Sequence, residues 1–324
     1  MSISHANPSQ LQPSDDPDGP ILQIGADRLI EGVERLTAAD QKADPEHARR
    51  FIQFASENQI DLKKFWARAD HQGNLLHSTL CVPSPGRTCM MFSTNPSKEG
   101  DIRSVAGVIK HACLELVEGE LDLAQALLEP SEKSLHDAYL RAGFTPLATL
   151  HYLERPLPTR LIEPESAWPD DVTITTYKND QNVQLERILD DSYTNTLDCP
   201  GLFGLRDTRD ILEGHRASGE FDPSLWFILN VDGQPRGVLL LNPAPASHAV
   251  ELVYMGLAPN ARGRGLGRRL LTHGLNALVG RREHNVTLAV DENNAPAQEL
   301  YRRAGFRAVL RRRALIRSLR SKDA

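Results

Sequence analysis

The sequence predicts an α/β protein of the α+β type, built from two similar domains in tandem. Its 324 residues exceed the usual size of one domain. Short apolar runs typical of strands alternate with runs that show helical spacing. Residues 127–144 can be laid without gaps on residues 289–306, at an offset of 162, and five of the last six positions are identical. This match indicates an internal duplication.

The first half predicts one domain at residues 21–154, after a polar tail at residues 1–20 that we expect to be disordered. Asp44 followed by Pro45 is typical of a helix start. A proline-rich linker at residues 155–171 follows the domain. Within 21–36 we expect a short strand and a helix. The further strands are expected at 62–69, 75–82, 87–93, 121–128 and 147–153, and the helices at 45–57, 101–118 and 131–142.

The second half predicts a domain at residues 172–324. Its segment 250–257 is apolar at nearly every position, as in a strand that is buried on both faces. Residues 194–219 are rich in polar residues and hold Cys199-Pro200-Gly201, and no helix or strand is predicted there. The other strands are expected at 172–177, 225–231, 236–241 and 286–290, and the helices at 183–193, at 265–279 and from Pro296 onward.

Charge is distributed unevenly along the chain, although the net charge is only -6. Residues 161–251 hold 16 acidic and 6 basic residues, whereas residues 252–324 hold 5 acidic and 15 basic ones. The C-terminal part therefore suits a polyanionic ligand. Arg311-Arg312-Arg313 would also suit nucleic acid, which we regard as the less favoured partner.

The composition argues against membrane, secreted and metal-binding classes. No apolar run approaches the roughly eighteen residues of a membrane helix, and the start of the chain lacks a signal peptide's apolar stretch. We therefore expect a cytoplasmic protein with no membrane partner. Reduced thiols and no metal site are expected, because neither a C-x-x-C pair nor a histidine cluster accompanies the cysteines Cys81, Cys89, Cys113 and Cys199.

The turn Arg262-Gly263-Arg264-Gly265-Leu266-Gly267 joins the strand at 250–257 to the next helix. Its glycines let backbone N–H groups face a ligand, and the helix brings its positive dipole end there. The turn therefore favours an anion site over a solvated surface turn. A dinucleotide site would need an acidic residue at the end of the next strand, but Glu283 precedes that strand. The Gly-Lys-Ser/Thr of a P-loop is absent.

This order of strand, Arg-x-x-Gly-x-Gly turn, helix, strand, Asn and a helix with Tyr before Gly-Phe resembles the GNAT superfamily of acyl-CoA-dependent N-acyltransferases. The resemblance covers about residues 225 to 310. The spacings from Glu251 to Pro259 and from Arg262 to Arg268 are most similar to the tandem GNAT enzymes of the mycothiol synthase type. The family implies domains with a mixed, largely antiparallel twisted sheet flanked by helices. The matching residues are Arg262, Gly265, Gly267, Asn294, Tyr301, Gly305 and Phe306.

The resemblance implies acetyl-CoA as the acyl donor and assigns its contacts. The backbone of Met255, Gly256 and Leu257 would bind the pantetheine arm and the acetyl carbonyl, because the strand splays from its neighbour there in the family. Asn294 would meet the pantetheine arm or would serve as a helix N-cap. The pyrophosphate would be held by Arg262, Gly263, Arg264, Gly265, Leu266, Gly267 and Arg268.

Two side chains are candidates for proton transfer. Glu251 would be the general base, because a carboxylate in so apolar a strand is partly desolvated, or it would pair with an arginine for structure. Tyr301 would protonate the leaving thiolate, as the resemblance implies, or it would be a core aromatic, since it shares a helix face with Ala297, Leu300 and Ala304.

The first repeat departs from this pattern. At the offset of 162, Arg262–Gly267 meets Gly100–Val105, which lacks the glycine pair and places Asp101 where phosphate oxygens would bind. Glu251 meets Cys89, or Thr88 if the strand-ending prolines are aligned. We therefore expect a degenerate, inactive N-terminal domain at residues 21–154 and a catalytic domain at residues 172–324.

The expected function is N-acetyl transfer from acetyl-CoA to a primary amine of a small molecule or peptide. Two alternatives remain: acetylation of a cysteinyl-sugar amine, as in the mycothiol synthase type, and a non-catalytic acyl-CoA-binding regulator. The sequence does not indicate the acceptor or the oligomeric state.

Overall fold

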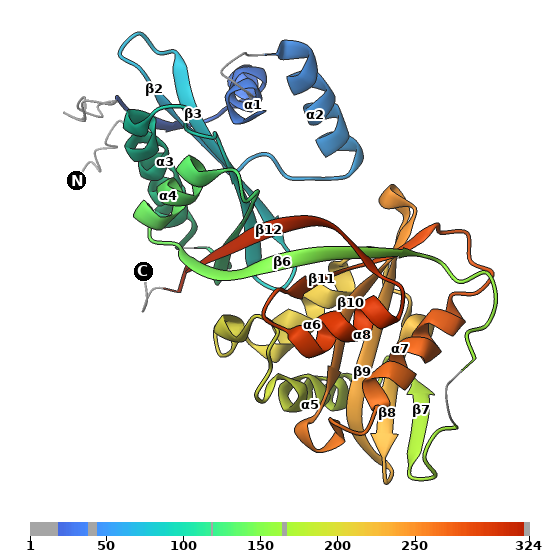
Figure 1. Ribbon diagram of the computed structural model, residues 1–324. Coiled ribbons are helices and arrows are strands. Elements are labelled where there is room, and N and C mark those ends of the chain that lie inside the picture. Colours follow the sequence, from blue (N-terminus) through green and yellow to red (C-terminus); the bar gives the residue numbers. More distant parts are fainter. Residues whose placement is uncertain (1–18, 38–43, 118, 164–166, 321–324) are drawn as a thin grey trace, which may run out of the picture. The chain divides into compact units, whose positions relative to one another are not determined.

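The computed structural model describes residues 19–37, 44–117, 119–163 and 167–320 (Figure 1). Most of the tail expected at residues 1–20 lies outside these ranges. The chain forms two compact units that interleave along the sequence. The first unit contains the chain up to Val82, then Met90–Gly119 and Glu132–Phe144. The second contains Pro83–Cys89, Glu120–Ser131 and the chain from Thr145 onward.

The strands and helices of the first unit lie close to the positions predicted from the sequence. Strands β1 (Ile21–Gln23), β2 (Phe65–Ala69), β3 (Leu75–Ser84) and β4 (Thr88–Ser93) follow in that order, and β2 and β3 form the expected antiparallel hairpin. Asp44 caps the second helix, because its Oδ1 accepts from the N–H groups of Glu46 and His47 at 3.0 and 3.1 Å. The helices are α1 (Leu29–Thr37), α2 (Pro45–Glu57), α3 (Glu99–Val117) and α4 (Lys133–Arg141).

The second unit is built on the sheet β5-β12-β6-β11-β10-β9-β8-β7. In this order the pairs are antiparallel, except for the parallel pair of β10 and β11. The strands are β5 (Leu123–Leu128), β6 (Thr145–Pro156), β7 (Val172–Thr176), β8 (Trp226–Val231), β9 (Gln234–Ala244), β10 (Ala249–Leu257), β11 (Asn285–Asp291) and β12 (Arg307–Ser318). The helices are α5 (Asn182–Tyr193), α6 (Thr208–Ala217), α7 (Leu266–Ala277) and α8 (Ala295–Arg303).

The last strands of the two repeats exchange places. At the offset of 162, β12 corresponds to β6 and β11 corresponds to β5. β12 pairs with β5 of the first repeat and not with β11 of its own, and β6 pairs with β11 of the second repeat and not with β5 of its own. β6 and β12 also pair with each other. The exchange explains why β6, which we expected to complete the first domain, belongs to the second compact unit.

Alternate residues of the central strands face two separate cores. Leu239 and Leu241 of β9 pack with α7 and α8, whereas Val238 and Leu240 pack with α5 and α6. The two helix pairs therefore cover opposite faces of this sheet (Figure 1). This period-two pattern is what a strand with two covered faces requires.

The sequence missed two elements, and one expectation needs correction. Helix α6 and strand β12 lie in segments for which no helix or strand was predicted. The strand at 250–257 is not buried on both faces throughout, because from Glu251 onward only Leu252 is fully buried. Its half-exposed end marks the candidate site.

Candidate active site

Strands β10 and β11 pair only at their beginnings. Ala249, Val250 and Glu251 lie opposite Asn285, Val286 and Thr287, and no further pair follows. On its other edge β10 stays paired with β9 as far as Leu257, with an irregularity between Leu252 and Tyr254. The edge that follows Glu251 therefore has backbone groups that β11 does not satisfy, which is the splay that the resemblance implied.

A cavity of about 280 Å³ lies beside this edge, and we call it the strand-end cavity. Its walls come from the end of α5, the end of β10, the glycine turn and the start of α8. Six residues predicted to bind the donor line it together: Met255, Gly256, Leu257, Arg262, Gly267 and Asn294.

Gly256 allows α5 to lie against β10. A Cβ atom at this position would be 2.6 Å from the Tyr254 hydroxyl and 2.8 Å from the Ser192 hydroxyl. These groups are themselves bonded: Ser192 donates to the carbonyl of Leu189 at 2.8 Å, so it accepts from Tyr254 at 2.7 Å. A larger residue would have to displace the helix.

Arg262 fastens the turn to its surroundings. Its Nε donates to the carbonyl of Leu257 at 2.9 Å, and its two terminal nitrogens donate to the carbonyls of Ser192 and Asn195 at 2.8 and 3.2 Å. The guanidinium thus ties the last turn of α5 to the end of β10. Arg262, which was predicted to hold the pyrophosphate, therefore lies at the cavity wall with its guanidinium bonded to backbone carbonyls.

The glycine turn itself is open. Gly263 and Gly265 have φ angles of 74° and 73°, and a Cβ on either would meet nothing within 4 Å. Within the described residues, the N–H groups from Gly263 to Gly267 donate to no backbone carbonyl. The N–H groups of the turn and the N-terminus of α7 therefore direct partial positive charge into the space in front of the turn. Arg264, by contrast, pairs with Asp171 at 2.6 Å.

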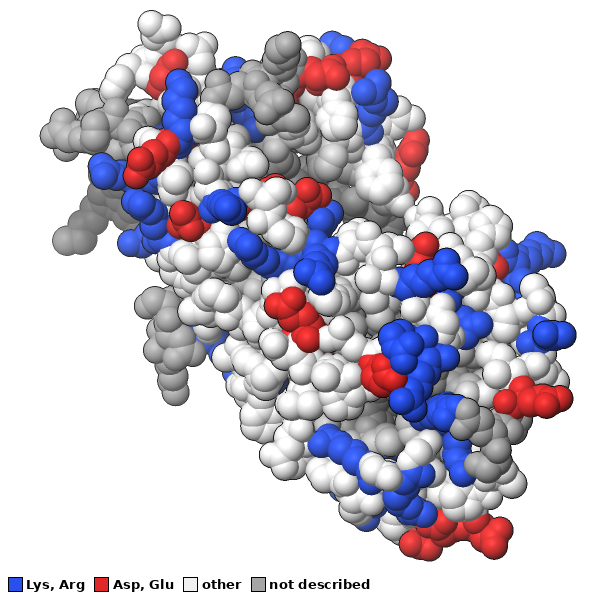
Figure 2. All heavy atoms as spheres, in the orientation of Figure 1, with Lys and Arg blue, Asp and Glu red and all other residues white. Residues whose placement is uncertain are grey.

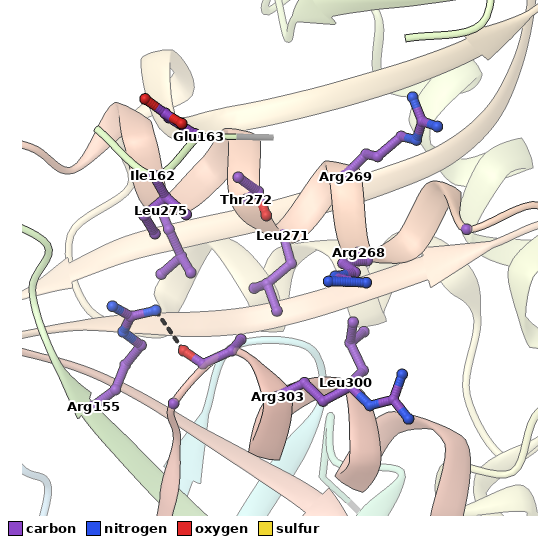
Figure 3. Close-up of a pocket in the computed structure, with 13 residues that line it drawn as sticks. Arg155, Ile162, Glu163, Arg268, Arg269, Leu271, Thr272, Leu275, Leu300 and Arg303 are labelled. Atoms are coloured by element: carbon purple, nitrogen blue, oxygen red, sulfur yellow. Dashed lines mark hydrogen bonds between the residues drawn. The ribbon is translucent and has the colours of Figure 1, made fainter. Parts of the chain in front are cut away.

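Beyond the turn lies a basic cavity of about 520 Å³ between α7 and α8, which we call the α7–α8 cavity. Figure 3 shows Arg155, Arg268 and Arg303 around it, with Arg155 donating to the carbonyl of Ala304 at 2.5 Å. Gly265 also lines this cavity, so the turn separates it from the strand-end cavity. Lys and Arg side chains gather on this side of the second unit (Figure 2).

Glu251 lies on β10 just before the splay and is half-buried. Its Oε2 accepts a hydrogen bond from the hydroxyl of Ser218 at 2.7 Å. It lines neither of the cavities described above. No arginine forms an ion pair with it among the described residues, so the structure does not support the alternative of a structural pair.

Tyr301 is the buried residue of α8 and makes an edge-on contact with Phe306, with ring centroids 5.6 Å apart. Burial, with the charge of Asp198 and the neighbouring Tyr254, raises the pKa of Tyr301 above its usual value. The tyrosine is thus a core aromatic, as one interpretation of the sequence had it, and it lines none of the cavities described here, although Asp198 and Tyr254 at the wall of the strand-end cavity act on it electrostatically.

Asn294 is the N-cap of α8, because its Oδ1 accepts from the N–H of Ala297 at 3.3 Å. The capping alternative is therefore confirmed. The side chain also hydrogen-bonds to Asp198, and the residue lines the strand-end cavity, so capping leaves it at the site.

A further cavity of about 390 Å³ lies among α5, α6 and β10, and we call it the α5–α6 cavity. Tyr193, Asp198, His215 and Tyr254 belong to its wall, and none of them was a candidate site residue from the sequence. The sequence pointed to this region only through the polar composition of residues 194–219 and through the GNAT resemblance, which implies that such a region often shapes the acceptor pocket.

Among the described residues none of the four cysteines forms a disulfide, and Cys81, Cys89 and Cys113 are buried. In the part of the chain that the structure describes, no three His, Cys, Asp or Glu side chains are arranged to hold a metal ion. None of the described helices is both long and apolar enough to cross a bilayer.

Residues 184–306 match the acetyltransferase (GNAT) family. This match includes β10, the glycine turn, β11 and α8, the elements around the strand-end cavity. The chain contains a GNAT acetyltransferase domain.

The GNAT domain is also similar to curated mycothiol acetyltransferases. The protein of Streptomyces bingchenggensis is 31% identical over 166 residues, 51% of this chain and 53% of that protein. The protein of Acidothermus cellulolyticus is 32% identical over 205 residues, 58% of this chain and 57% of that protein. The chain thus spans about half the length of the curated relatives it matches.

Solved structures show the tandem GNAT fold over most of the chain. A GCN5-related N-acetyltransferase from Sphaerobacter thermophilus has a TM-score of 0.59 at 17% identity and covers 93% of this chain and 96% of its own. A tandem GNAT protein from the clavulanic acid biosynthesis pathway has a TM-score of 0.50 at 13% identity, with coverages of 93% and 98%. At these identities the likeness concerns the fold alone.

Proposed function

We propose that this protein transfers the acetyl group of acetyl-CoA to a primary amine of a small molecule or peptide. The observation that carries the proposal is the unpaired end of β10, which borders a cavity and lies next to a glycine turn with open amides. Acetyl-CoA carries its thioester on a long arm that contains amides and ends in a diphosphate. It therefore matches both the unpaired end of β10 and the glycine turn. The backbone edge suits the amides, and the turn suits the diphosphate.

The donor contacts follow from this placement. The pantetheine arm lies along Met255, Gly256 and Leu257 in the strand-end cavity, and Asn294 borders it. The diphosphate lies on the amides of the turn from Gly263 to Gly267. The nucleotide end extends toward the α7–α8 cavity, where Arg268 supplies positive charge.

Acetyl transfer requires removal of a proton from the acceptor's ammonium and delivery of a proton to the departing thiolate. We assign the first role to Glu251 and the second to Tyr301. The nitrogen then bonds to the acetyl carbon as the carbon–sulfur bond breaks. Tyr301 keeps its proton through the physiological pH range because of its raised pKa, as a donor must.

Two measurements test the proposal with the full chain. Calorimetry with acetyl-CoA should show binding at micromolar concentration, and free CoA should accumulate when a panel of amines is added. Absence of heat with acetyl-CoA would refute the donor site. Binding without release of CoA by any amine would support a non-catalytic acyl-CoA-binding regulator instead.

A second candidate acceptor comes from the relatives, which are named mycothiol acetyltransferases. A cysteinyl-sugar amine is therefore the alternative substrate. Including such an amine in the panel decides between the two, because a preference for it by about 100-fold or more in kcat/KM would mark it as the substrate. We also propose that the protein is located in the cytoplasm.

A further inference from the structure

The α5–α6 cavity adjoins the strand-end cavity, since both are lined by Thr196, Asp198 and Tyr254. Its volume of about 390 Å³ falls within the range of small-molecule sites. In the proposed reaction the thioester lies in the strand-end cavity. A molecule in the α5–α6 cavity would therefore meet the thioester at these three shared residues.

The carboxylate of Asp198 has no cationic partner. Its Oδ1 accepts from the N–H of Asp291 at 3.1 Å, and no Lys, Arg or His among the described residues forms an ion pair with it. The titratable groups that act on it electrostatically are Asp291, Cys199, Tyr193, Tyr254 and Tyr301, none of which is a cation. Although the residue as a whole is exposed, burial of the carboxylate and the charge of Asp291 raise the pKa of Asp198.

The wall of the cavity contains one arginine, which has other partners. Arg206 donates to the carbonyl of Gly86 at 2.7 Å and to that of Asp210 at 3.0 Å, and it forms no ion pair with Asp198 among the described residues. A second carboxylate, Asp190, also lines the cavity and accepts a hydrogen bond from Thr208. The cavity therefore carries an excess of negative charge on its walls.

The remaining wall is aromatic and neutral. The rings of Tyr193 and Tyr254 lie 5.5 Å apart, and His215 stacks on Tyr254 at 5.4 Å. Burial and the charge of Arg206 lower the pKa of His215 to about 4, so the ring is neutral at pH 7. Its Nε2 is buried and has no hydrogen-bond partner within the described residues. Aromatic faces attract cations, and a lone imidazole nitrogen accepts a hydrogen bond.

We propose that the α5–α6 cavity selects its acceptor by charge and shape: a primary ammonium binds at Asp198 beside the rings of Tyr193 and Tyr254, while an N–H or O–H group of the same molecule donates to His215. The proposal rests on the proposed function and adds the substrate class: a small cationic amine with an apolar body and a second hydrogen-bond donor. Anionic molecules of the same shape are excluded by Asp190 and Asp198.

The test compares tyramine with 3-(4-hydroxyphenyl)propionate, which carries a carboxylate in place of the ammonium. Binding is measured by calorimetry on the full chain saturated with CoA. The variant is Asp198→Asn, and its Asn side chain can still accept from Asp291. The matched control is Asp191→Asn, because Asp191 is exposed on α5 and pairs with Arg236 at 3.6 Å, outside the cavity. The unfolding temperature of each variant confirms that it is folded.

We expect the wild type to bind tyramine but not the anion, and Asp198→Asn to weaken tyramine binding roughly tenfold or more. In turnover assays the same variant should raise KM for tyramine with kcat and acetyl-CoA affinity nearly unchanged. Asp191→Asn should behave as the wild type.

Equal tyramine binding by the wild type and Asp198→Asn, or no tyramine binding at all, would overturn the acceptor site. Tyramine binding that depends on Asp198 without any release of CoA from acetyl-CoA would uphold the cationic site and refute the acetyltransferase proposal. The two failures are thus distinguishable.

Discussion

The two repeats of this chain differ at the N-termini of corresponding helices, α3 in the first repeat and α7 in the second. In the first repeat, the carboxylate of Asp101 accepts from the hydroxyl of Ser97 at 3.0 Å and from the N–H of Lys98 at 3.2 Å. In the second, the corresponding position is Gly263, where a Cβ atom would meet nothing within 4 Å. The first repeat therefore supplies its own anion where the second leaves room for one.

Tyr139 and Tyr301, which correspond at the offset of 162, also differ in their surroundings. The hydroxyl of Tyr139 is fully buried and bonds to the carbonyl of Met91 and the hydroxyl of Ser93, each at 3.1 Å. Tyr301 keeps the same edge-on contact with a phenylalanine, but Asp198 and Tyr254 of the cavity wall act on it electrostatically. The same residue type thus serves packing in the first repeat, and in the second we propose it as the proton donor.

The largest effect is expected from placing a carboxylate at Gly263, the position that corresponds to Asp101 of the first repeat. Gly263→Asp should weaken acetyl-CoA binding by about 100-fold or more, roughly 2.7 kcal/mol, because the carboxylate would compete with the diphosphate for the amides of the turn. Gly263→Asn is the matched control, since it has the same shape without the charge. Calorimetry measures both. Equal affinities of the two variants would show that charge at this turn does not matter.

Removing the hydroxyl from each tyrosine should separate their roles. Tyr301→Phe should lower kcat roughly 10- to 100-fold with little loss of stability, because it removes the proposed proton donor. Tyr139→Phe should leave kcat unchanged and lower the free energy of unfolding by about 1–2 kcal/mol, because it leaves buried acceptors unbonded. Steady-state kinetics and urea unfolding give the two readouts. A normal kcat for Tyr301→Phe would make it a packing residue like its counterpart.

The proposed base can be compared with its counterpart in the same way. Cys89 is completely buried, whereas Glu251 is half-buried. Glu251→Gln should lower kcat by about tenfold or more, most strongly at acidic to neutral pH, because Gln can accept from Ser218 but cannot take a proton. Cys89→Ala should leave kcat as it is. A pH profile of Glu251→Gln that overlays the wild type would remove Glu251 from the mechanism.

The smallest effect concerns stability at acidic pH. At the offset of 162, His215 of α6 corresponds to the exposed Gln53 of α2. Since the pKa of His215 is lowered to about 4, the folded chain stays unprotonated there as the pH falls below 6.5, while the unfolded chain binds a proton. The wild type should therefore lose stability between pH 6.5 and 4, and His215→Gln should lose about 1–2 kcal/mol less. Urea unfolding at pH 7.5 and 5 checks this. Parallel losses in both proteins would contradict it.

Local patterns predicted most of the elements, because helical spacing, turn residues and caps such as Asp44 act over a few residues. They also brought together six donor-binding candidates around one cavity. The guanidinium bonds of Arg262 and the need for glycine at 256 depend on α5, which lies more than sixty residues earlier in the chain. A turn motif alone holds no information about such a partner.

The α5–α6 cavity was not predictable for a related reason. Asp198 and His215 come from a polar segment in which no helix or strand was predicted, and the cavity that they share forms only when α6 packs beside β10. Strand β12 was missed because its arginines obscured its alternation, and in the sheet Arg312 pairs with Glu129 at 3.1 Å. That pairing places Arg311-Arg312-Arg313 within a strand of the sheet, rather than in a free basic tail.

The exchange of β6 and β12 makes each half of the sequence a structural part of the other. The strand β11, whose divergence from β10 opens the strand-end cavity, is held on its far edge by β6, which comes from the first repeat. Expression of residues 157–324 alone would leave that edge bare and prone to self-association. Cleavage within 157–171, in contrast, should yield two fragments that stay together through purification. The first repeat is thus a structural part of the sheet that carries the proposed active site, because β11 would have no partner on its far edge without β6.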